Sequence, residues 1–131
     1  KIINTAIKIK KGITKELIIG DISIKRDWGY AEEYVEAMQL INRSQIKKDY
    51  LVCTGKSYSL QDIIEIIFSK LGLNWKNHIK SSKDLFRKSE IQSSKGNPQS
   101  IHHDLGWKAN TNIYKLIDIL IKYEIQKNRK I

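Results

Sequence analysis

Apolar residues recur at spacings of three and four along much of the chain, which predicts several amphipathic helices. A first helix is expected over residues 2–10, with Gly12 as its stop. A second, over residues 30–43, has acidic residues in its first turn and an apolar stripe that includes Met38. The capping sequence S-L-Q-D opens a third helix that spans residues 59–71.

Two further helices are expected toward the C-terminal end. Asn97-Pro98 places a capping side chain before a proline and opens a short helix that closes at Gly106. Thr111 is expected to cap the final helix. The apolar stripe of that helix consists of Ile113, Leu116, Ile117, Leu120 and Ile121.

Strand signals are fewer and shorter. Apolar runs predict strands at residues 17–19 and 50–53, with a further extended stretch at residues 77–79, and the polar residues 81–96 predict a loop. The alternation of helices and strands indicates an α/β fold that is mostly helical, but the strands are too few for a self-sufficient sheet. We therefore expect the chain to be part of a longer protein.

Composition narrows the class of protein. The chain has 131 residues, 40% hydrophobic and 29% charged, which is room for one domain and excludes a disordered tail. No apolar run approaches the roughly 20 residues of a membrane helix, and no secretory signal is recognisable. A single cysteine, Cys53, favours a reducing, cytoplasmic setting, so we expect a soluble cytoplasmic protein.

The charge is strongly positive, with 24 Lys and Arg against 14 Asp and Glu. Three explanations are open at this point. The chain could be a basic nucleic-acid-binding module, its lysines could be solvated decoration in an Ile- and Lys-rich sequence, or a few arginines could hold a phosphate-bearing ligand. No helix-turn-helix or aromatic RNA-binding motif is present and the lysines are spread through every segment, so nucleic acid is the least favoured partner.

Two clusters of charged residues could carry chemistry. Arg26 could bind a phosphate while Asp27 orients it or caps the following helix, or the two could form a surface ion pair beside a core Trp28. Arg87 and Glu90 could pair with each other or hold a ligand's phosphate and hydroxyl groups, or belong to a solvated charged loop.

Other combinations carry less weight. His102 and His103 would point about 100° apart on a helix, so they cannot readily share a metal ion. Tyr123 and Lys127 have the spacing of a Tyr-x-x-x-Lys dyad, but in so lysine-rich a chain this match is expected by chance. No two glycines stand two apart, which excludes a G-x-G-x-x-G dinucleotide loop from this chain.

Longer motifs point to one family. Residues 20–31 read G-D-I-S-I-K-R-D-W-G-Y-A, and residues 34–38 read Y-V-E-A-M. Together they closely resemble the segment G-N-L-x-A-K-R-D-W-G-Y-A-x-D-Y-V-E-A-M of the GDP-mannose 4,6-dehydratases, which are extended short-chain dehydrogenase/reductases. Further similar segments are Y-L-V-C-T-G at residues 50–55, L-G-L-N-W at 71–75, F-R with Glu90 at 86–90, and G-N-P to L-G-W-K at 96–108.

The resemblance covers only the C-terminal, substrate-binding part of that family. It implies that residues 1–131 are the nucleotide-sugar-binding portion of a longer enzyme, whose Rossmann core, NADP loop and catalytic residues lie upstream of the matched region. By the same resemblance, Arg26 and Arg87 would bind the diphosphate of GDP-mannose, Glu90 would accept hydrogen bonds from ribose hydroxyls, and Lys1 would approach the guanine. The full-length enzyme would use NADP, form a homo-oligomer and produce GDP-4-keto-6-deoxymannose for GDP-fucose biosynthesis.

This chain departs from the family pattern at a few positions. Lys88 replaces a proline and Gln92 replaces an aspartate, which makes the loop of Arg87 less rigid. Because the catalytic residues are not in this chain, we expect no bound cofactor, no turnover, and weak or no binding of GDP-sugars by the chain alone. Another nucleotide-sugar dehydratase, epimerase or reductase of the same superfamily is the alternative identification.

Overall fold

The polypeptide backbone alternates helices with short strands. The computed structural model describes residues 1–87 and 89–127. In chain order the elements are α1 (Ile2–Lys10), β1 (Leu17–Ile19), β2 (Lys25–Asp27), α2 (Ala31–Arg43), β3 (Ser57–Ser59), α3 (Leu60–Lys70), the 3-10 helix η1 (Trp75–Asn77), β4 (Ile79–Ser81), the 3-10 helix η2 (Lys83–Leu85), α4 (Gln99–Leu105) and α5 (Ile113–Lys127). The prediction of a mostly helical α/β fold with a few short strands is confirmed.

The helix ends follow the predicted signals in most cases. Ser59 and Asp62 form the complete capping box of α3, each side chain bonding the backbone N–H of the other residue. Gly106 ends α4 with a φ of 68°, a left-handed conformation that favours glycine. The prediction for α5 was wrong in detail, because Asn112 accepts from the Lys115 N–H while the Thr111 hydroxyl donates to Glu33.

The strands pair across long stretches of sequence. In the described residues β1 pairs with β4 in parallel, with Leu17 opposite Ile79, and β2 pairs with β3 in antiparallel register, with Arg26 opposite Tyr58. The strand predicted at residues 50–53, a segment that the structure describes in full, is wrong because those residues are assigned to no strand. Tyr50 and Val52 instead pack on a small core, so their apolar character reflects burial and not pairing.

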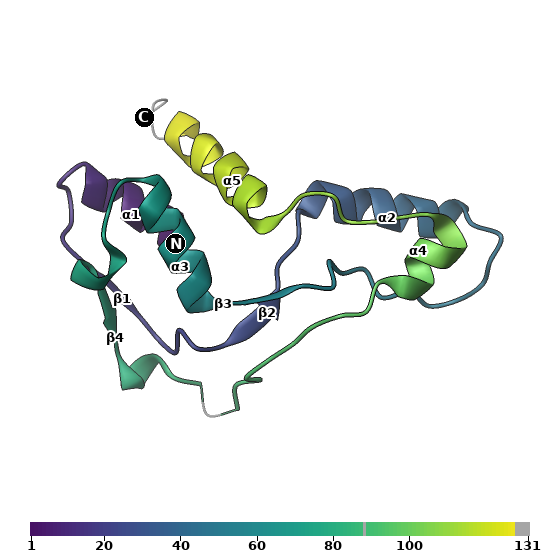
Figure 1. Cartoon of the computed structure of the whole chain (residues 1–131), viewed down its shortest axis with the longest axis horizontal. Helices are drawn as coiled ribbons and strands as arrows, with labels where there is room; N and C mark the ends of the chain where they lie inside the picture. Colours follow the sequence, from purple (N-terminus) through teal and green to yellow (C-terminus); the bar gives the residue numbers. More distant parts are fainter. Residues whose placement is uncertain (88, 128–131) are drawn as a thin grey trace.

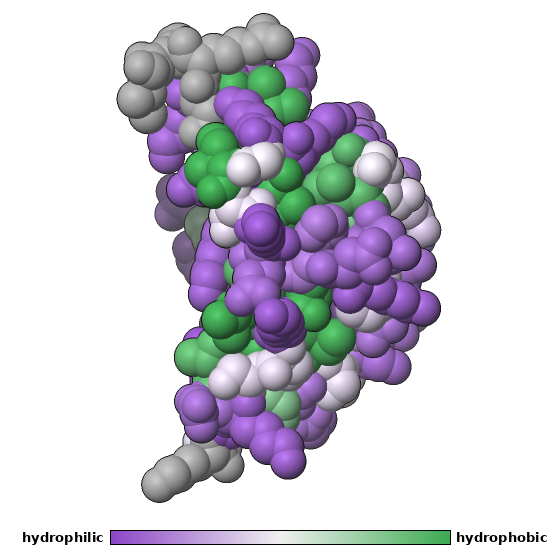
Figure 2. Space-filling view, turned by 90° about the vertical axis from the view of Figure 1, so that its left-hand side faces the viewer, coloured by the Kyte–Doolittle hydropathy of each residue, from purple (hydrophilic) through white to green (hydrophobic). Residues whose placement is uncertain are grey.

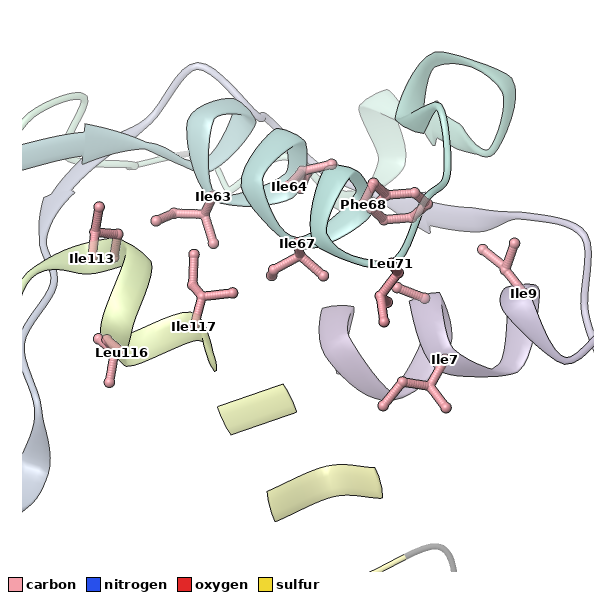
Figure 3. Close-up of a cluster of buried hydrophobic side chains, with 11 residues drawn as sticks. Ile7, Ile9, Ile63, Ile64, Ile67, Phe68, Leu71, Ile113, Leu116 and Ile117 are labelled. Atoms are coloured by element: carbon pink, nitrogen blue, oxygen red, sulfur yellow. The ribbon is translucent and has the colours of Figure 1, made fainter. Parts of the chain in front are cut away.

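The main core lies among α1, α3 and α5, which we call the three-helix lobe. Figure 3 shows Ile63 and Ile67 of α3 facing Ile117 of α5, with Phe68 of α3 and Leu71, which follows the helix, near α1. Phe68 and Ile64 are fully buried, and such burial stabilises a fold by about 1.5–3 kcal/mol per large side chain.

A second, smaller core joins α2 and α4, which we call the two-helix lobe. Its buried members are Ala37, Ile101 and Trp107, and the Tyr34 ring meets the Trp107 ring edge to face with 6.0 Å between their centroids. Met38, which the sequence placed on the apolar stripe of α2, is 61% exposed. Figure 1 shows the two lobes at opposite ends of the molecule, with β2 and β3 between them.

The surface is mostly polar. Viewed from the side of α1, β1 and β4, it is largely hydrophilic with small separate apolar patches (Figure 2). Separate patches of this kind are ordinary on a protein surface. Among residues 1–87 and 89–127, no helix has the length and apolar character needed to span a bilayer.

Candidate functional site

Arg26 lies on β2, between the two lobes, where pairing with β3 fixes its backbone. Its guanidinium donates to Oε1 of Glu90 at 2.5 Å through one terminal nitrogen and to the Lys25 carbonyl at 2.7 Å through the other. Glu90 comes from the loop that follows η2, 64 residues away in sequence. The fold therefore brings together two of the residues that the resemblance assigned to ligand binding.

Arg87 lies on the same loop as Glu90. Its Nε atom lies 3.8 Å from Oε2 of Glu90, so the predicted pairing of these residues is present, although the Arg87 side chain is 82% exposed. Glu90, whose side chain is 18% exposed, thus lies between two guanidinium groups. Lys88 lies outside the described residues, so its effect on the loop stays a prediction.

A pocket of about 350 Å³ opens beside these groups, near the lower end of the range for small-molecule sites of roughly 300–1,000 Å³. Trp28, Leu60 and Phe86 give it apolar walls, and Arg26, Arg87 and Glu90 supply its charged groups. Its remaining lining residues are Gly20, Asp21, Ile24, Leu85 and Gln92.

Glycine is needed at position 20 of this pocket. A Cβ atom there would lie 2.8 Å from the backbone oxygen of Leu85, closer than such atoms approach in proteins. The residue after Gly20, Asp21, accepts hydrogen bonds from both the N–H and the hydroxyl of Ser23, and these bonds lower the pKa of its carboxyl group. Asp21 therefore adds a second negative charge to a lining that also holds two guanidinium groups.

The segment that returns from this loop is fastened to β2. The Lys25 N–H donates to the Gln92 carbonyl at 2.8 Å, and the Ser94 N–H donates to the Lys25 carbonyl at 3.1 Å. Asp27, at the end of β2, neither orients Arg26 nor caps α2, which corrects the sequence interpretation. Its carboxylate instead accepts hydrogen bonds from the backbone at Thr54 and Gly55.

Lys1 is not brought to this pocket. It lines a separate, largely apolar groove of about 450 Å³ between α1, α3 and α5. Trp28 lines both this groove and the pocket of Arg26. The role of Lys1 at the guanine stays a prediction.

A larger hollow of about 620 Å³ lies beside α3, lined by Tyr58, Tyr114 and polar residues of α3. Two of its three charged groups already have partners, since Asp62 belongs to the capping box and Lys70 is 2.6 Å from Asp118, and the third, Glu65, is acidic and does not suit a phosphate. We therefore place the candidate site at the pocket of Arg26.

Other candidate groups lie elsewhere in the molecule. His103 Nδ1 lies 2.7 Å from Oδ1 of Asp104, and Oδ2 of the same carboxylate accepts a hydrogen bond from Lys48. Tyr123 is 64% exposed near the end of α5. In the described ranges, no group of three or more His, Cys, Asp and Glu side chains could hold a metal ion.

Three glycines of the chain lie at the wrong end of a helix to bind a phosphate. Gly12, Gly72 and Gly106 have positive φ angles but follow the C-terminal ends of helices, where carbonyl groups gather. A phosphate needs the N–H groups of a helix N-terminus instead. These three glycines therefore do not provide a phosphate-binding turn, and the expectation that residues 1–131 bind no cofactor stays a prediction.

The sequence contained signals for only part of this site. Motifs of the family identify the two arginines and Glu90 as candidate site residues. Phe86 lies in one of these motifs but was given no role at the site, and Leu60 was noted only within the capping sequence of a helix. Trp28 was interpreted as a core residue, and it does pack against the main core while its Nε1 donates to the Tyr58 carbonyl at 3.3 Å. Only the fold shows that its ring also forms a wall of the pocket.

Comparison with known sequences gives a consistent result. A family model described as GDP-mannose 4,6 dehydratase matches residues 1–120. The chain is 35% identical over 119 residues to GDP-mannose 4,6 dehydratase 1 of Arabidopsis thaliana, covering 91% of this chain and 33% of that protein. It is 25% identical to the human GDP-mannose 4,6 dehydratase, covering 98% of this chain and 39% of that protein. The chain thus spans about a third of the length of these relatives.

Solved structures share the fold. A Pseudomonas aeruginosa RMD complexed with NADPH aligns with a TM-score of 0.84 at 19% identity, over 96% of this chain and 41% of that one. A dTDP-glucose 4,6-dehydratase of Bacillus anthracis in complex with NAD aligns with a TM-score of 0.79 at 16% identity, over 99% and 40%. The fold is that of part of an extended short-chain dehydrogenase/reductase, and the match of the family model over residues 1–120 shows that the chain belongs to the GDP-mannose 4,6-dehydratase family.

Proposed function

We propose that residues 1–131 are the C-terminal, nucleotide-sugar-binding portion of a GDP-mannose 4,6-dehydratase, and that the pocket of Arg26 binds the GDP part of GDP-mannose. The observation that carries this proposal is the position of Glu90 between the guanidinium groups of Arg26 and Arg87 at the edge of a partly apolar pocket. Membership of the family supplies the substrate class.

The chemistry of these groups suits a nucleoside diphosphate. A guanidinium is planar and always charged, and it can donate two parallel hydrogen bonds to a phosphate. Arg26 is held on a strand, so a diphosphate can replace Glu90 as its partner without movement of the backbone. The released Glu90 carboxylate can then accept hydrogen bonds from ribose hydroxyls, and the exposed Arg87 can turn onto the diphosphate.

The affinity of the chain alone is expected to be weak. Asp21 places a negative charge on the pocket lining, and Glu90 competes with the ligand for Arg26. Both effects reduce the net attraction of the pocket for a diphosphate.

The full-length enzyme is proposed to be an NADP-dependent lyase that forms GDP-4-keto-6-deoxymannose for GDP-fucose biosynthesis. NADP belongs to the part of the enzyme outside this chain, so we expect no turnover by residues 1–131 alone. We also propose a homo-oligomeric full-length enzyme. The single, unpaired thiol of Cys53 supports a cytoplasmic setting.

Isothermal titration with GDP and GDP-mannose tests the site. We expect weak binding with one site per chain, and about a tenfold loss of affinity for Arg26→Ala or Arg87→Ala, as expected when a charged hydrogen bond to the ligand is removed. Arg43→Ala is the matched control, because Arg43 is an exposed arginine in the last turn of α2.

Two results would contradict the proposal. One is the same affinity in all four proteins, and the other is tighter binding of UDP or dTDP than of GDP. The second result would favour another nucleotide-sugar enzyme of the same superfamily.

A further inference from the structure

The carboxylate of Asp27 joins three segments of the chain. Its Oδ1 accepts from the Thr54 N–H at 2.9 Å and from the Thr54 hydroxyl at 2.6 Å. Its Oδ2 accepts from the Gly55 N–H at 2.9 Å and from the Gly96 N–H at 3.4 Å. One side chain at the end of β2 thus satisfies donors from two separate loops.

Each of the two loops has a glycine whose backbone N–H donates to Asp27, and there is little space for a side chain at either position. Gly55 has a φ of 76°, and a Cβ atom on it would lie 3.1 Å from the Pro98 ring. A Cβ atom on Gly96 would lie 2.3 Å from Sγ of the buried Cys53, so another residue fits there only if Cys53 or Gly96 moves. We call this meeting point of Asp27 with the Thr54–Gly55 and Gly96 loops the junction. It is tightly packed, and it forms because backbone N–H groups of both loops lie close to the Asp27 carboxylate.

This junction is connected to the candidate site on both sides. Asp27 directly follows Arg26 on β2, and Gly96 lies in the segment that returns from Arg87 and Glu90 toward α4. Between these points the loop pairs with β2 again, through the hydrogen bonds of Lys25 to Gln92 and Ser94. The position of Glu90 relative to Arg26 therefore depends on where Asp27 holds the returning loop.

We propose that Asp27 is a positioning residue, whose carboxylate sets the loop of Arg87 and Glu90 against Arg26 and so shapes the diphosphate site. Asp27 does not line the pocket itself, so it acts through the loop and not by contact with the ligand. The link to ligand binding rests on the proposed function, whereas the effect on the loop does not.

In the described part of the chain, the titratable side chains that interact with the Asp27 carboxylate include those of Tyr34 and Cys53. The Tyr34 hydroxyl lies close to Gly29, and burial together with the negative charges of Asp27 and Glu33 raises the pKa of Tyr34 to about 12. Burial, with a contribution from Asp27, also raises the pKa of the Cys53 thiol. Both groups are therefore neutral near pH 7, and Asp27 relies on its hydrogen-bond donors for compensation.

The variant Asp27→Asn tests the proposal in the whole chain. It keeps the size of the side chain but replaces one acceptor oxygen with an amide that faces N–H donors. We expect the amide of Ser94, which does not contact Asp27, to exchange about tenfold faster or more in hydrogen-exchange mass spectrometry. Titration with GDP is expected to show an affinity about tenfold lower with an unchanged number of sites.

The controls separate positioning from a loss of folding. Asp104→Asn removes a carboxylate that also joins several partners, but in the two-helix lobe, and should leave Ser94 exchange and GDP affinity unchanged. If Asp27→Asn fails to fold, Thr54→Val removes one hydrogen bond to the same carboxylate and should show the same changes on a smaller scale. A reduced number of GDP sites at unchanged affinity would indicate partial unfolding and overturn the proposal.

The two proposals fail in different ways. If the unaltered chain does not bind GDP, the proposed function is wrong for this chain, and Ser94 exchange still decides the role of Asp27. If GDP binds but Asp27→Asn changes neither exchange nor affinity, the positioning role is wrong and the proposed function stands.

Discussion

The two lobes of the molecule are stabilised in different ways. The three-helix lobe buries eleven residues in one apolar cluster, whereas the two-helix lobe buries only Ala37, Ile101 and Trp107. The smaller lobe is rich in long-range hydrogen bonds of carboxylates instead. Glu33 accepts from the backbone and hydroxyl of Thr111, and Asp104 accepts from Lys48 and Tyr50.

The contrast shows how a small apolar core can still fix loops in place. The free energy gained by burying apolar side chains depends little on their relative orientation. Apolar burial therefore stabilises the packing of helices against one another but does not set the position of a loop precisely. A carboxylate that accepts several N–H and O–H groups fixes distances and directions. Arg26, which lines the pocket, lies on β2, and β2 runs between the two lobes (Figure 1). The pocket therefore lies where the two kinds of stabilisation meet.

The largest expected effect is in the core of the three-helix lobe. Phe68 is fully buried, so Phe68→Ala should lower the free energy of unfolding by about 3–5 kcal/mol through lost contacts and a residual cavity. Urea denaturation followed by circular dichroism measures this loss. Leu120→Ala on the exposed side of α5 is the control, and an equal loss in both variants would show that this lobe is not the main core.

A smaller effect is expected in the two-helix lobe from Glu33→Gln. Oε1 of Glu33 accepts from the Thr111 N–H at 3.0 Å and the Thr111 hydroxyl at 2.8 Å, and Oε2 accepts from the same N–H at 3.3 Å. Glutamine keeps only one acceptor oxygen, without the negative charge, so the Oε2 bond is lost and the remaining bonds are weaker. We expect a loss of about 1–2 kcal/mol and faster hydrogen exchange at Thr111, with exchange in α3 unchanged.

The exposed neighbour Glu32 provides the matched control for this variant, as Glu32→Gln. If both variants destabilise the chain equally, the effect arises from the charge at the start of α2 and not from the hydrogen bonds of Glu33.

The smallest effect concerns pH. Hydrogen bonds from His103, Lys48 and Tyr50 lower the pKa of Asp104 from 3.8 to about 2. A lowered carboxyl pKa in the folded state contributes stability above the unfolded value, which is lost as the pH falls from about 4 to about 2. Asp104→Asn should therefore flatten the pH dependence of the melting temperature in that window, and Asp49→Asn serves as control. An unchanged slope in Asp104→Asn would show that this ionised network does not stabilise the lobe.

Helices with a regular apolar pattern and local capping residues were predictable from the sequence. Ser59 with Asp62, and the glycines after α1, α3 and α4, act through contacts within a few residues, so their effect does not depend on the rest of the fold. The capping of α5 was missed because Thr111 and Asn112 are both good caps, and Glu33, which is distant in sequence, takes the Thr111 hydroxyl.

Strands were harder to predict because strand pairing is a long-range property. The polar segments of β2 and β3 carry no strand pattern, and they pair because α2 and the following loop bring them together. The apolar residues 50–53, by contrast, carry a strand pattern but are buried without being assigned to a strand in the described structure.

The sequence by itself determined the family, the five main helices and the identity of Arg26, Arg87 and Glu90 as a candidate ligand-binding group. These properties reside in local patterns and ordered motifs. Only the tertiary structure decided that Glu90 lies between the two arginines, that Lys1 lines another groove, and that Asp27 joins the Thr54 and Gly96 loops. Residues separated by tens of positions meet only after the chain has folded, and no local pattern records which side chains then share a hydrogen bond.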